Sequence, residues 1–582
     1  MILSHGTEPT DSATLVSRAV VTGEFRRAAT SRSGSVILIA ILGTASIFYF
    51  CFLKSDRFGA YHDDGIYVAT ARSLADGQGY RILSLPDEPA QTKYPPLYPL
   101  ILSLIWRVQP AFPDNLTLMM VLSVIAALSF LLLTRRYLVS SEYASPLQAL
   151  IVVALTALNW RTVILSTSVY SEMLYAALSV GGLQLAEKHL NGKTGRMSGM
   201  ILGLLIGLAF LTRTSGIALL VALAAYSLLK RQWRKALLPV GIGMVFVLAW
   251  AAWCYVNKNA SQDLNAPFYT SYFAHLNQVV TDLQAQGGSS RLAVHFGMAL
   301  ENFIGGILVS IPLVCTGLNY QVLARLSEYL PGAGLGILFL IVILVSAGFI
   351  RTASKRVRLL HIYLVMSLGL YLFWLPSVSY DRFLMPMLPF LLLFLVCELG
   401  MLVSLARKGL QSGEAWGKVS GSFISFILFA LIGLTLYGYG SGAYSSFKSL
   451  QPSASRAADD AQAISWIKEN TASSDSLVCY RDPKYFLYTG HKAVRSFPMT
   501  EGYSWEEDQS SMEKLAHAVF RIIDEARARY IVVTATDFEL EDRPEQHRKT
   551  FDSLIEQHPQ NFVLVYESTD RRTRIFRIDG VT

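Results

Sequence analysis

The chain has 582 residues, of which 52% are hydrophobic and only 16% are charged, and its mean hydropathy is +0.39. A soluble protein of this length needs more charge to cover its surface, so the composition indicates an integral membrane protein. The net charge of +8 is uneven: residues 451–582 carry 17 Lys and Arg against 22 Asp and Glu, a net of −5, and the first 450 residues carry +13. A nucleic-acid-binding protein would concentrate positive charge in a soluble domain, and this distribution excludes that class.

The five cysteines form neither a disulfide framework nor a metal-cluster motif. Four lie in or beside apolar runs, the polar C-terminal region holds one, and no pair has the CxxC spacing. They are Cys51, Cys254, Cys315, Cys397 and Cys479.

The N-terminal tail, residues 1–34, is polar and is predicted to be a flexible cytoplasmic segment. The first apolar run begins near Ser35 and is predicted to be a signal anchor without a cleavable signal. A helix needs about 20 apolar residues to cross a hydrocarbon core of about 30 Å. Eleven runs qualify, some of them short, near 35–53, 115–134, 146–165, 169–187, 197–212, 215–229, 236–255, 332–350, 359–375, 383–402 and 421–439.

Basic residues predict the orientation of these spans. With the N-terminus in the cytoplasm, every cluster of Lys and Arg falls on the cytoplasmic side, as the positive-inside rule expects. The clusters are Arg18, Arg26, Arg27 and Arg32; Arg135 and Arg136; Lys188, Lys193 and Arg196; Lys230, Arg231, Arg234 and Lys235; Arg351, Lys355, Arg356 and Arg358; and Arg407, Lys408 and Lys418. We therefore predict a multi-pass plasma (inner) membrane protein.

Two further apolar stretches fit a span poorly. Residues 95–106 would rise only about 18 Å as a helix, which is too short to cross. Residues 303–318 are interrupted by Gly305, Gly306 and Pro312. Both are predicted to be interfacial or re-entrant helices on the extracytoplasmic side. The predicted transmembrane domain, residues 35–439, thus has long outer segments at 54–114 and 256–331.

Residues 440–582 follow the last predicted span and are expected outside the cytoplasm. Helical patterns such as "ADDAQAISWIKEN" and "MEKLAHAVFRIIDEARA" alternate with short β-rich runs such as "DSLVCY", "RYIVVTA", "NFVLVYES" and "TRIFRI". This alternation predicts a small extracytoplasmic α/β domain.

Two adjacent carboxylates, Asp63 and Asp64, directly follow the first span in "YHDDGIYVATARSLADGQGY". The residues after them have the pattern of an amphipathic helix that ends at Gly77 and Gly79. One interpretation is that Asp63 or Asp64 is only the N-cap of this helix. The other is that a carboxylate at the mouth of a helical bundle acts as a general base on a hydroxyl.

Other charged residues are predicted at the same membrane depth. Lys93 precedes "YPPLYP", Glu172 lies in "VYSEMLY", Arg213 in "FLTRTSG" and Arg382 in "SYDRFLMPMLP". Taken singly, each is typical of an interfacial anchoring residue. Together they suit a phosphate-bearing amphiphile, with cations for the phosphate and a carboxylate for an incoming nucleophile.

The order of elements resembles the GT-C glycosyltransferases, in the branch with protein O-mannosyltransferases and lipid A aminoarabinose transferases. The resemblance covers nearly the whole chain, and its most specific parts are "HDDGIYVATARSLADG", "TKYPPLYPLILSL", "SEMLYAALS", "GLAFLTRTSG" and "DRFLMPMLPFLLL". It implies a polytopic helical GT-C fold and a sugar donor linked through phosphate to a polyprenyl lipid.

The resemblance also implies roles for individual residues. The catalytic base of the family falls on Asp63, with Asp64 as its neighbour. Basic residues that would bind the donor phosphate fall on Arg72, Lys93 and Arg382. Glu172, Arg213 and His275 are further candidate site residues.

No metal and no other cofactor are predicted. Some members of the family bind zinc through a glutamate directly before the lysine and a histidine of the central loop. The first of these positions is Thr92 in this chain, although His275 in "SYFAHLNQ" lies in a plausible place for the second.

The implied reaction is inverting transfer of the sugar to a hydroxyl acceptor, which could be a lipid, a glycan or a protein. Such a reaction needs no nucleotide, and the sequence has neither a Walker A motif nor a dinucleotide fingerprint. Two other classes stay open: a lipid or solute transporter or flippase, and a non-catalytic scaffold with the same fold. Transporters usually place ionisable residues near the bilayer midplane and often show inverted repeats, and neither feature is evident here.

Overall fold

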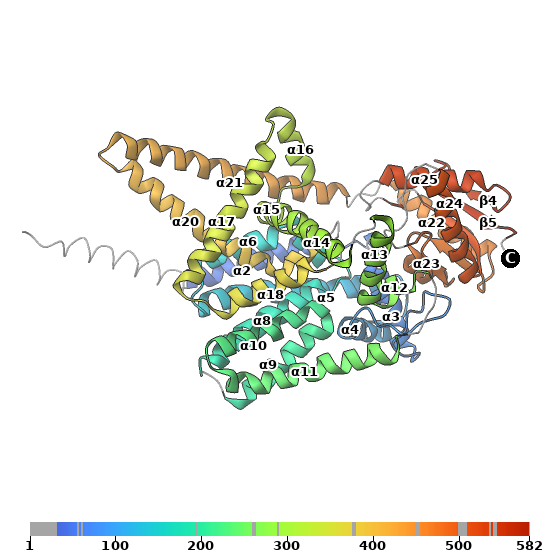
Figure 1. The fold of residues 1–582 in the computed structure, drawn as a ribbon, viewed down its shortest axis with the longest axis horizontal. Coiled ribbons are helices and arrows are strands. Elements are labelled where there is room, and N and C mark those ends of the chain that lie inside the picture. Colours follow the sequence, from blue (N-terminus) through green and yellow to red (C-terminus); the bar gives the residue numbers. More distant parts are fainter. Residues whose placement is uncertain are drawn as a thin grey trace, which may run out of the picture.

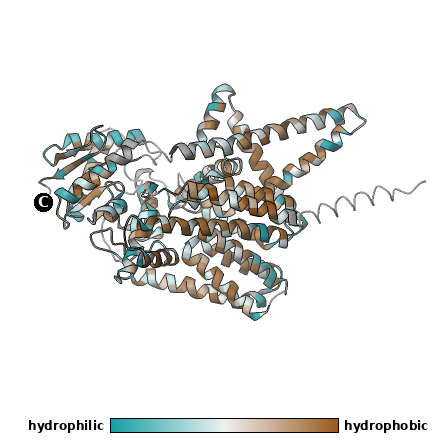
Figure 2. Cartoon of the chain, turned by 180° about the vertical axis from the view of Figure 1, so that it is seen from behind, coloured by the Kyte–Doolittle hydropathy of each residue, from teal (hydrophilic) through white to brown (hydrophobic). Residues whose placement is uncertain are grey.

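A computed structural model describes residues 32–54, 57–59, 62–192, 195–258, 264–287, 290–374, 380–449, 454–498, 509–534, 537–538 and 544–580. The predicted flexible tail, residues 1–34, lies almost entirely outside these ranges. A helical body carries a small α/β domain at one end, beside the helices of the first outer segment (Figure 1). Hydrophobic residues dominate the helices of the body, and hydrophilic residues gather on the C-terminal domain and at helix ends (Figure 2).

Each predicted span corresponds to a helix or to a pair of helices. The helices are α2 (Arg32–Cys51), α5 (Asn115–Ser140), α6 (Pro146–Leu158) with α7 (Trp160–Ser166), α8 (Glu172–Leu190), α9 (Arg196–Thr212), α10 (Ile217–Leu229), α11 (Trp233–Val256), α17 (Ala333–Lys355), α18 (Leu359–Leu372), α20 (Leu388–Leu410) and α21 (Ala415–Ser449). The last of them extends beyond residue 440, where the C-terminal domain was predicted to begin.

Fewer helices meet the requirements of a membrane span than the eleven that the sequence predicts. Within the described ranges, seven helices are long and apolar enough to cross a membrane, or eight if the bent pair α6 and α7 is one span. Helices α9, α10 and α18 are apolar but shorter, and α8 carries several polar residues. The multi-pass helical architecture is confirmed, and the count of eleven stays a prediction.

One end of the bundle gathers the predicted cytoplasmic basic clusters. Arg358 donates to Glu187 at 2.9 Å, and Arg351 donates to Glu398 at 2.6 Å. Lys235 donates from Nζ to the carbonyl of Leu190 at 2.6 Å. These bonds join the C-terminal end of α8 to the N-terminal ends of α11 and α18, and the C-terminal part of α17 to the middle of α20. The clusters that contain Lys235 and Arg358 therefore lie at the same end of α8.

The opposite end carries shorter helices and the loops between them. They are α3 (Asp63–Ala75), α4 (Leu97–Val108), η2 (Thr214–Gly216), α12 (Ala266–Thr270), α13 (Tyr272–Gly287), α14 (Arg291–Asn302), the π-helical η3 (Phe303–Ser310), α15 (Ile311–Thr316), α16 (Tyr320–Tyr329), α19 (Tyr380–Leu384) and η4 (Met385–Met387). The short helix predicted at 95–106 is α4.

The stretch around residues 303–318 differs from its sequence-based prediction. It belongs to a continuous helix, Arg291–Thr316, that is long and apolar enough to span a membrane. The glycines do not interrupt it, because they make room for aromatic rings. A Cβ on Gly305 would lie 2.6 Å from the ring of Tyr380, and one on Gly306 would lie 2.3 Å from the ring of Tyr371. The residues expected to break the helix are packing residues instead.

Both halves of this continuous helix contact the outer ends of other helices. Asn302 donates to the carbonyls of Leu372 and Trp374, at the end of α18. A Cβ on Gly438 of α21 would lie 2.4 Å from the carbonyl oxygen of Thr316. Asn302 thus joins this helix to the end of α18, and the C-terminal end of the helix packs in the core of the bundle beside α21.

The C-terminal domain is an α/β domain, as predicted. It consists of α22 (Ala454–Asn470), β1 (Ser476–Cys479), α23 (Asp482–Thr489), β2 (Ala493–Val494), α24 (Gln509–Glu525), β3 (Ala528–Val533), α25 (Pro544–Gln557), β4 (Phe562–Glu567) and β5 (Arg574–Ile578). The strands form one sheet in the order β2-β1-β3-β5-β4, parallel from β2 to β3 and antiparallel at β5.

This domain packs against the first outer segment. Lys492 pairs with Glu88 at 2.5 Å, and the backbone N–H of Ala493 donates to the carbonyl of Ser84 at 2.8 Å. Buried side chains of both parts belong to one hydrophobic cluster. The segment after α2 and the domain after α21 therefore lie on the same side of the membrane. An even number of crossings must separate them, which the predicted spans satisfy and an additional crossing by Arg291–Thr316 would not.

Candidate active site

Asp63 and Asp64 are the first two residues of α3, where the helix dipole favours negative charge. The N-cap position is His62, whose side chain makes no capping hydrogen bond. The interpretation of Asp63 or Asp64 as a simple N-cap residue therefore does not describe this helix. Both carboxylates are placed where the first outer segment meets the bundle.

Asp63 accepts two hydrogen bonds from residues far apart in the sequence. The hydroxyl of Tyr94 donates to Oδ1 at 2.6 Å, and Nη2 of Arg382 donates to Oδ2 at 3.0 Å. The side chain of Asp63 keeps 25% of its surface exposed, whereas that of Arg382 keeps 12%. A carboxylate that is held at both oxygens and still partly open can meet a ligand.

Arg382 also belongs to a chain of alternating charges. Its Nη2 lies 2.7 Å from Oε1 of Glu172, and Nη1 of Arg213 lies 3.0 Å from the same oxygen. Arg213 further donates to the hydroxyl of Ser171 at 3.1 Å. Glu172 is almost fully buried, at 1% exposure. This network (Asp63, Arg382, Glu172 and Arg213) places two carboxylates and two guanidinium groups in contact.

Helix ends bring the network together. Asp63 and Glu172 each start a helix, α3 and α8, while Arg213 follows the last residue of α9 in an extended conformation. Arg382 lies in α19, a short helix that precedes the apolar helix α20. Ionisable residues are costly within the hydrocarbon layer and are tolerated at its boundary. The four side chains converge because all four positions lie at helix ends on the same end of the bundle.

Lys93 lies beside this network on the first outer segment. Its Nζ donates to the carbonyl of Phe268 at 2.5 Å and lies 4.1 Å from the centre of the Phe268 ring. Burial lowers the pKa of Lys93 to about 8; the nearby Arg495 adds to this effect, and Asp63 opposes it. A buried ammonium group near a carboxylate and a guanidinium is suited to bind an anion.

The two adjacent carboxylates have different environments. Burial would raise the pKa of Asp63, but Arg382, the Tyr94 hydroxyl and Lys93 together hold it below its ordinary value. Burial raises the pKa of Asp64 to about 6 despite two bonds from backbone N–H groups, those of Gly59 at 2.8 Å and Gly65 at 2.9 Å. Asp64 is 2% exposed, and its hydrogen bonds stabilise the turn before α3, whereas Asp63 bonds to Arg382 of the network.

Arg72 and His275 do not join the network. At 100° per residue, a separation of nine positions puts Arg72 on the face of α3 opposite Asp63. It lies 5.9 Å from the ring of Trp106 and pairs with Asp76 at 3.6 Å. His275 packs edge-on against the ring of Phe268 at 5.5 Å. The Phe268 ring therefore separates His275 from Lys93, and Arg72 lies against Trp106 and not beside the network.

Residues without a motif of their own also surround Asp63 and Arg382. Tyr94 was overlooked although it directly follows Lys93. The pairing of Asp381 with Arg161 on α7 was also missed; Asp381 directly precedes Arg382. Adjacency to a predicted site residue was the available signal in both cases. The Arg161–Asp381 pair anchors the short helix α19 that carries Arg382.

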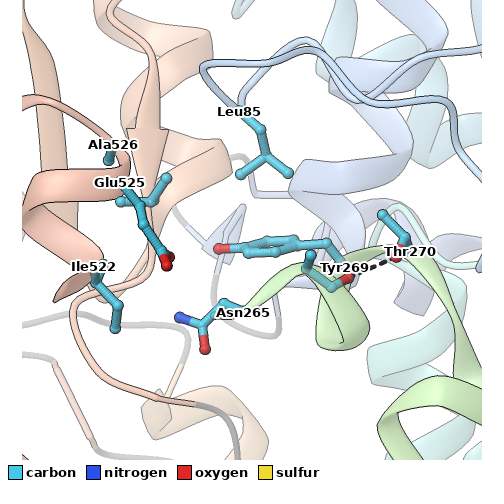
Figure 3. A pocket seen from close by; sticks show the side chains of 9 residues that line it. Leu85, Asn265, Tyr269, Thr270, Ile522, Glu525 and Ala526 are labelled. Carbon is cyan, nitrogen blue, oxygen red and sulfur yellow. Dashed lines mark hydrogen bonds between the residues drawn. The ribbon is translucent and has the colours of Figure 1, made fainter. Parts of the chain in front are cut away.

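The described residues do not hold any group of three His, Cys, Asp or Glu side chains arranged to bind a metal ion. Thr92, at the position where some related transferases have a glutamate, donates its hydroxyl to the carbonyl of Thr270. A small cavity lies on the other side of α12, where Tyr269 is positioned between Leu85 and Glu525 (Figure 3). None of the four network residues lines this cavity.

No protein-family model and no curated protein sequence matches the chain. Solved structures do match it. The apo structure of ArnT from Cupriavidus metallidurans aligns over 94% of this chain and 98% of its own, with 13% identity and a TM-score of 0.50. The oligosaccharyltransferase AglB from Archaeoglobus fulgidus, in complex with an inhibitory peptide and a dolichol-phosphate, aligns over 93% and 74%, with 13% identity and a TM-score of 0.51.

Both proteins are GT-C glycosyltransferases. The chain has the GT-C fold. A second structure of the archaeal enzyme, in complex with zinc and sulfate, aligns over 92% of this chain with the same identity of 13% and the same TM-score of 0.51. The resemblance inferred from the sequence motifs is thus confirmed at the level of the fold.

Proposed function

We propose that the chain is an inverting glycosyltransferase that moves a sugar from a polyprenyl-phosphate-linked donor to a hydroxyl acceptor. The observation that carries the proposal is the position of Asp63, a partly exposed carboxylate bonded to Arg382 with the buried Lys93 close by. A base and cations for a phosphate are the two groups that this reaction requires. The GT-C fold, shared with a transferase solved with a dolichol-phosphate, supports this donor class.

In the proposed reaction, Asp63 removes the proton of the acceptor hydroxyl. The hydroxyl oxygen forms a bond to the anomeric carbon while the bond from that carbon to the phosphate oxygen breaks. The electron pair of the broken bond stays on the phosphate, and attack opposite the leaving group inverts the anomeric configuration. Because the pKa of Asp63 is low, the carboxylate is ionised at neutral pH and available as a base.

The leaving polyprenyl phosphate gains negative charge as the bond to the sugar breaks. We assign Lys93 and Arg382 to this charge, because charge-assisted hydrogen bonds from fixed donors act most strongly in a site that excludes water. Lys93 is 6% exposed, and its Nζ donates to the backbone carbonyl of Phe268, a neutral acceptor that leaves the positive charge of the ammonium group uncancelled. We assign neither a metal ion nor any other cofactor to the reaction.

We place the reaction at the extracytoplasmic face of the plasma membrane, with the N-terminus in the cytoplasm. The predicted cytoplasmic basic clusters lie at the end of the bundle opposite the Asp63 network. The C-terminal domain and the first outer segment share the other end. The alternative of a transporter is disfavoured because the charged network lies at helix ends, where the described elements begin and stop, and not midway along them.

The acceptor can be identified by lipid and glycan profiling of a deletion strain, with the wild-type gene restored as a reference. We expect one glycosylated product to disappear on deletion and to return with the wild-type chain. The Asp63→Asn variant should fail to restore it. Asp76→Asn is the matched control, because this acidic residue follows the same helix and is 43% exposed.

The same donor class can be tested with the purified chain in lipid nanodiscs. Polyprenyl-phosphate sugars are supplied with the acceptor found by profiling, and release of polyprenyl phosphate is measured. If Asp63→Asn restores the product in cells and releases polyprenyl phosphate at the wild-type rate in vitro, Asp63 is not the base. If the wild type and Asp63→Asn both restore the product in cells but neither releases polyprenyl phosphate in vitro, the chain is a non-catalytic scaffold and the proposed function fails.

A further inference from the structure

His62, the residue directly before Asp63, has an unusual backbone conformation. Its φ is 62° and its ψ is −47°, outside the regions that residues with a side chain normally adopt. A conformation of this kind persists only where the surrounding structure stabilises it. Because His62 directly precedes α3, its backbone conformation sets the direction in which the first residue of the helix, Asp63, projects its side chain.

The side chain of His62 is held by the C-terminal domain. Its Nε2 lies 2.9 Å from Oδ1 of Asp482, the first residue of α23. Oδ2 of Asp482 accepts a hydrogen bond of 2.9 Å from the hydroxyl of Tyr269 on α12. Asp482 is fully buried and the His62 side chain is 10% exposed, so water screens this pair little. The His62 ring also packs against the rings of Phe268 and Tyr269.

The backbone around Asp63 is fitted to the same helix. A Cβ on Gly65 would lie 2.6 Å from Cβ of Pro483, and a Cβ on Gly59 would lie 2.7 Å from Cβ of Lys484. These two glycines stand on either side of the carboxylate pair, and Asp64 accepts hydrogen bonds from both of their N–H groups. The start of α23 therefore touches the turn that carries Asp63 at three points.

We propose that Asp482 is a positioning residue for Asp63: the C-terminal domain, through the buried His62–Asp482 pair, holds the turn in the conformation that presents the base. This inference rests on the proposed function for the role of Asp63 as base, but the geometry itself does not depend on it. It gives the C-terminal domain a defined part in the reaction, although the domain contributes no residue to the charged network.

A first experiment measures the turn directly and needs no substrate. Hydrogen–deuterium exchange is followed in the full chain in nanodiscs for the wild type, Asp482→Ala and the control Lys492→Met. Lys492 forms another contact between the domain and the first outer segment, with Glu88, away from Asp63. We expect Asp482→Ala to speed the exchange of amides 63–70 about tenfold, because local opening is no longer opposed. The control should leave these amides unchanged.

A second experiment measures turnover with the polyprenyl-phosphate sugar found in the test of the proposed function. We expect Asp482→Ala and His62→Ala each to lower kcat about 10- to 100-fold, because misplacing a base by a fraction of an ångström has effects of this size. The KM for the donor should stay within about twofold, since the phosphate contacts are not altered. The double variant should be no slower than either single variant, because the two residues act as one unit.

Each outcome decides one of the two claims. Unchanged exchange in Asp482→Ala, or additive losses in the double variant, would overturn the positioning role and leave the transferase intact. If Asp482→Ala does not fold, His62→Ala tests the same pair from the side of the first outer segment. If no polyprenyl-phosphate sugar supports turnover by the wild type, the proposed function fails and the exchange experiment alone decides the positioning role.

Discussion

Arg382 donates from Nη2 to Asp63 at 3.0 Å across 319 residues of sequence. The same nitrogen lies 2.7 Å from Glu172, so one guanidinium group joins the start of the first outer segment to the start of α8. A ligand phosphate that draws Arg382 away from Asp63 would leave the carboxylate freer to accept a proton. The ion pair thus links donor binding to the basicity of the proposed base.

The two adjacent carboxylates should respond differently to the same substitution. Asp63→Asn keeps an acceptor for Tyr94 but removes the base, and we expect turnover to fall by a factor on the order of 10² or more. Asp64→Asn keeps one of two acceptors for the N–H groups of Gly59 and Gly65, and turnover should stay within about tenfold of wild type. Measured kcat values for the two purified variants make the comparison.

The stability of the Asp64 variant provides a check on this assignment. The folded-state pKa of Asp64 is raised to about 6, so ionisation at neutral pH costs the folded state stability. That cost grows as pH rises from about 4 to about 6 and is absent below this window. Asn is neutral at every pH, so it removes the cost and offsets the lost hydrogen bond. We expect Asp64→Asn to change the free energy of unfolding by no more than about 1 kcal/mol at pH 7. If Asp64→Asn were inactive and Asp63→Asn active, the base would be Asp64 and not Asp63.

Glu172 is expected to stabilise the network because it separates two guanidinium groups. Glu172→Gln leaves Arg213 and Arg382 close together without their shared carboxylate. Removing one partner of a buried ion pair typically costs about 3–5 kcal/mol, and thermal unfolding of the full chain should show a loss of this order. The double variant Glu172→Gln/Arg213→Met should recover part of it, since one buried charge is removed.

A surface pair offers a control for this measurement. Glu567 lies 3.9 Å from Arg571, whose side chain is 83% exposed. Exposed pairs contribute at most about 1 kcal/mol, so Glu567→Gln should barely change the unfolding temperature. If Glu172→Gln also left the unfolding temperature unchanged, the network would not be a buried unit. If the loss of stability in the double variant equalled the sum of the losses in the two single variants, the network would not be cooperative.

Much of the fold and part of the site could be predicted from the sequence, for physical reasons. Apolar runs must match the bilayer thickness, so the positions of the helices can be predicted from the sequence. Charged residues are costly within the hydrocarbon layer and favour its boundary. Five charged residues could therefore be grouped before their contacts were known: Asp63, Lys93, Glu172, Arg213 and Arg382. Arg72 could have been excluded from the geometry of its helix alone. The contact between His62 and Asp482, 420 residues apart, leaves no local signal. The same holds for Gly306, whose neighbour is a ring on another helix.

Gly306 provides a test of the continuous helix Arg291–Thr316. A Cβ at this position would meet the Tyr371 ring at 2.3 Å, so Gly306→Ala should destabilise the chain by about 1–3 kcal/mol through overpacking. Gly433→Ala on α21 is the matched control, because no heavy atom lies within 4 Å of the added Cβ and alanine favours the helix. Thermal unfolding of both variants checks the prediction. Equal stability of the two would place Gly306 away from Tyr371.

The orientation of the chain can be tested by labelling single cysteines in a variant without the five native ones. Ser474 is exposed on the C-terminal domain, and Ser354 is exposed near the end of α17, in a basic cluster predicted to be cytoplasmic. A membrane-impermeant thiol reagent should label Ser474→Cys in intact spheroplasts and Ser354→Cys only after lysis. The reverse pattern would overturn the orientation. Labelling of both in intact spheroplasts would mean that an even number of spans separates Ser354 from Ser474, in place of the odd number predicted.

The pH dependence of kcat/KM should report Lys93, because its pKa is lowered to about 8 by burial and by Arg495. Below this pH the ammonium is charged and can bind the donor phosphate; as pH rises through about 8 the charge is lost, and kcat/KM should fall about tenfold per pH unit. The pKa of Asp63 lies below its ordinary value, so no acidic loss from this group is expected above about pH 5. Lys93→Arg keeps its charge at all accessible pH values, and its profile should lack the alkaline decline even if its maximum is lower. An alkaline decline near pH 8 that persists in Lys93→Arg would assign that ionisation to another group and remove Lys93 from the phosphate site.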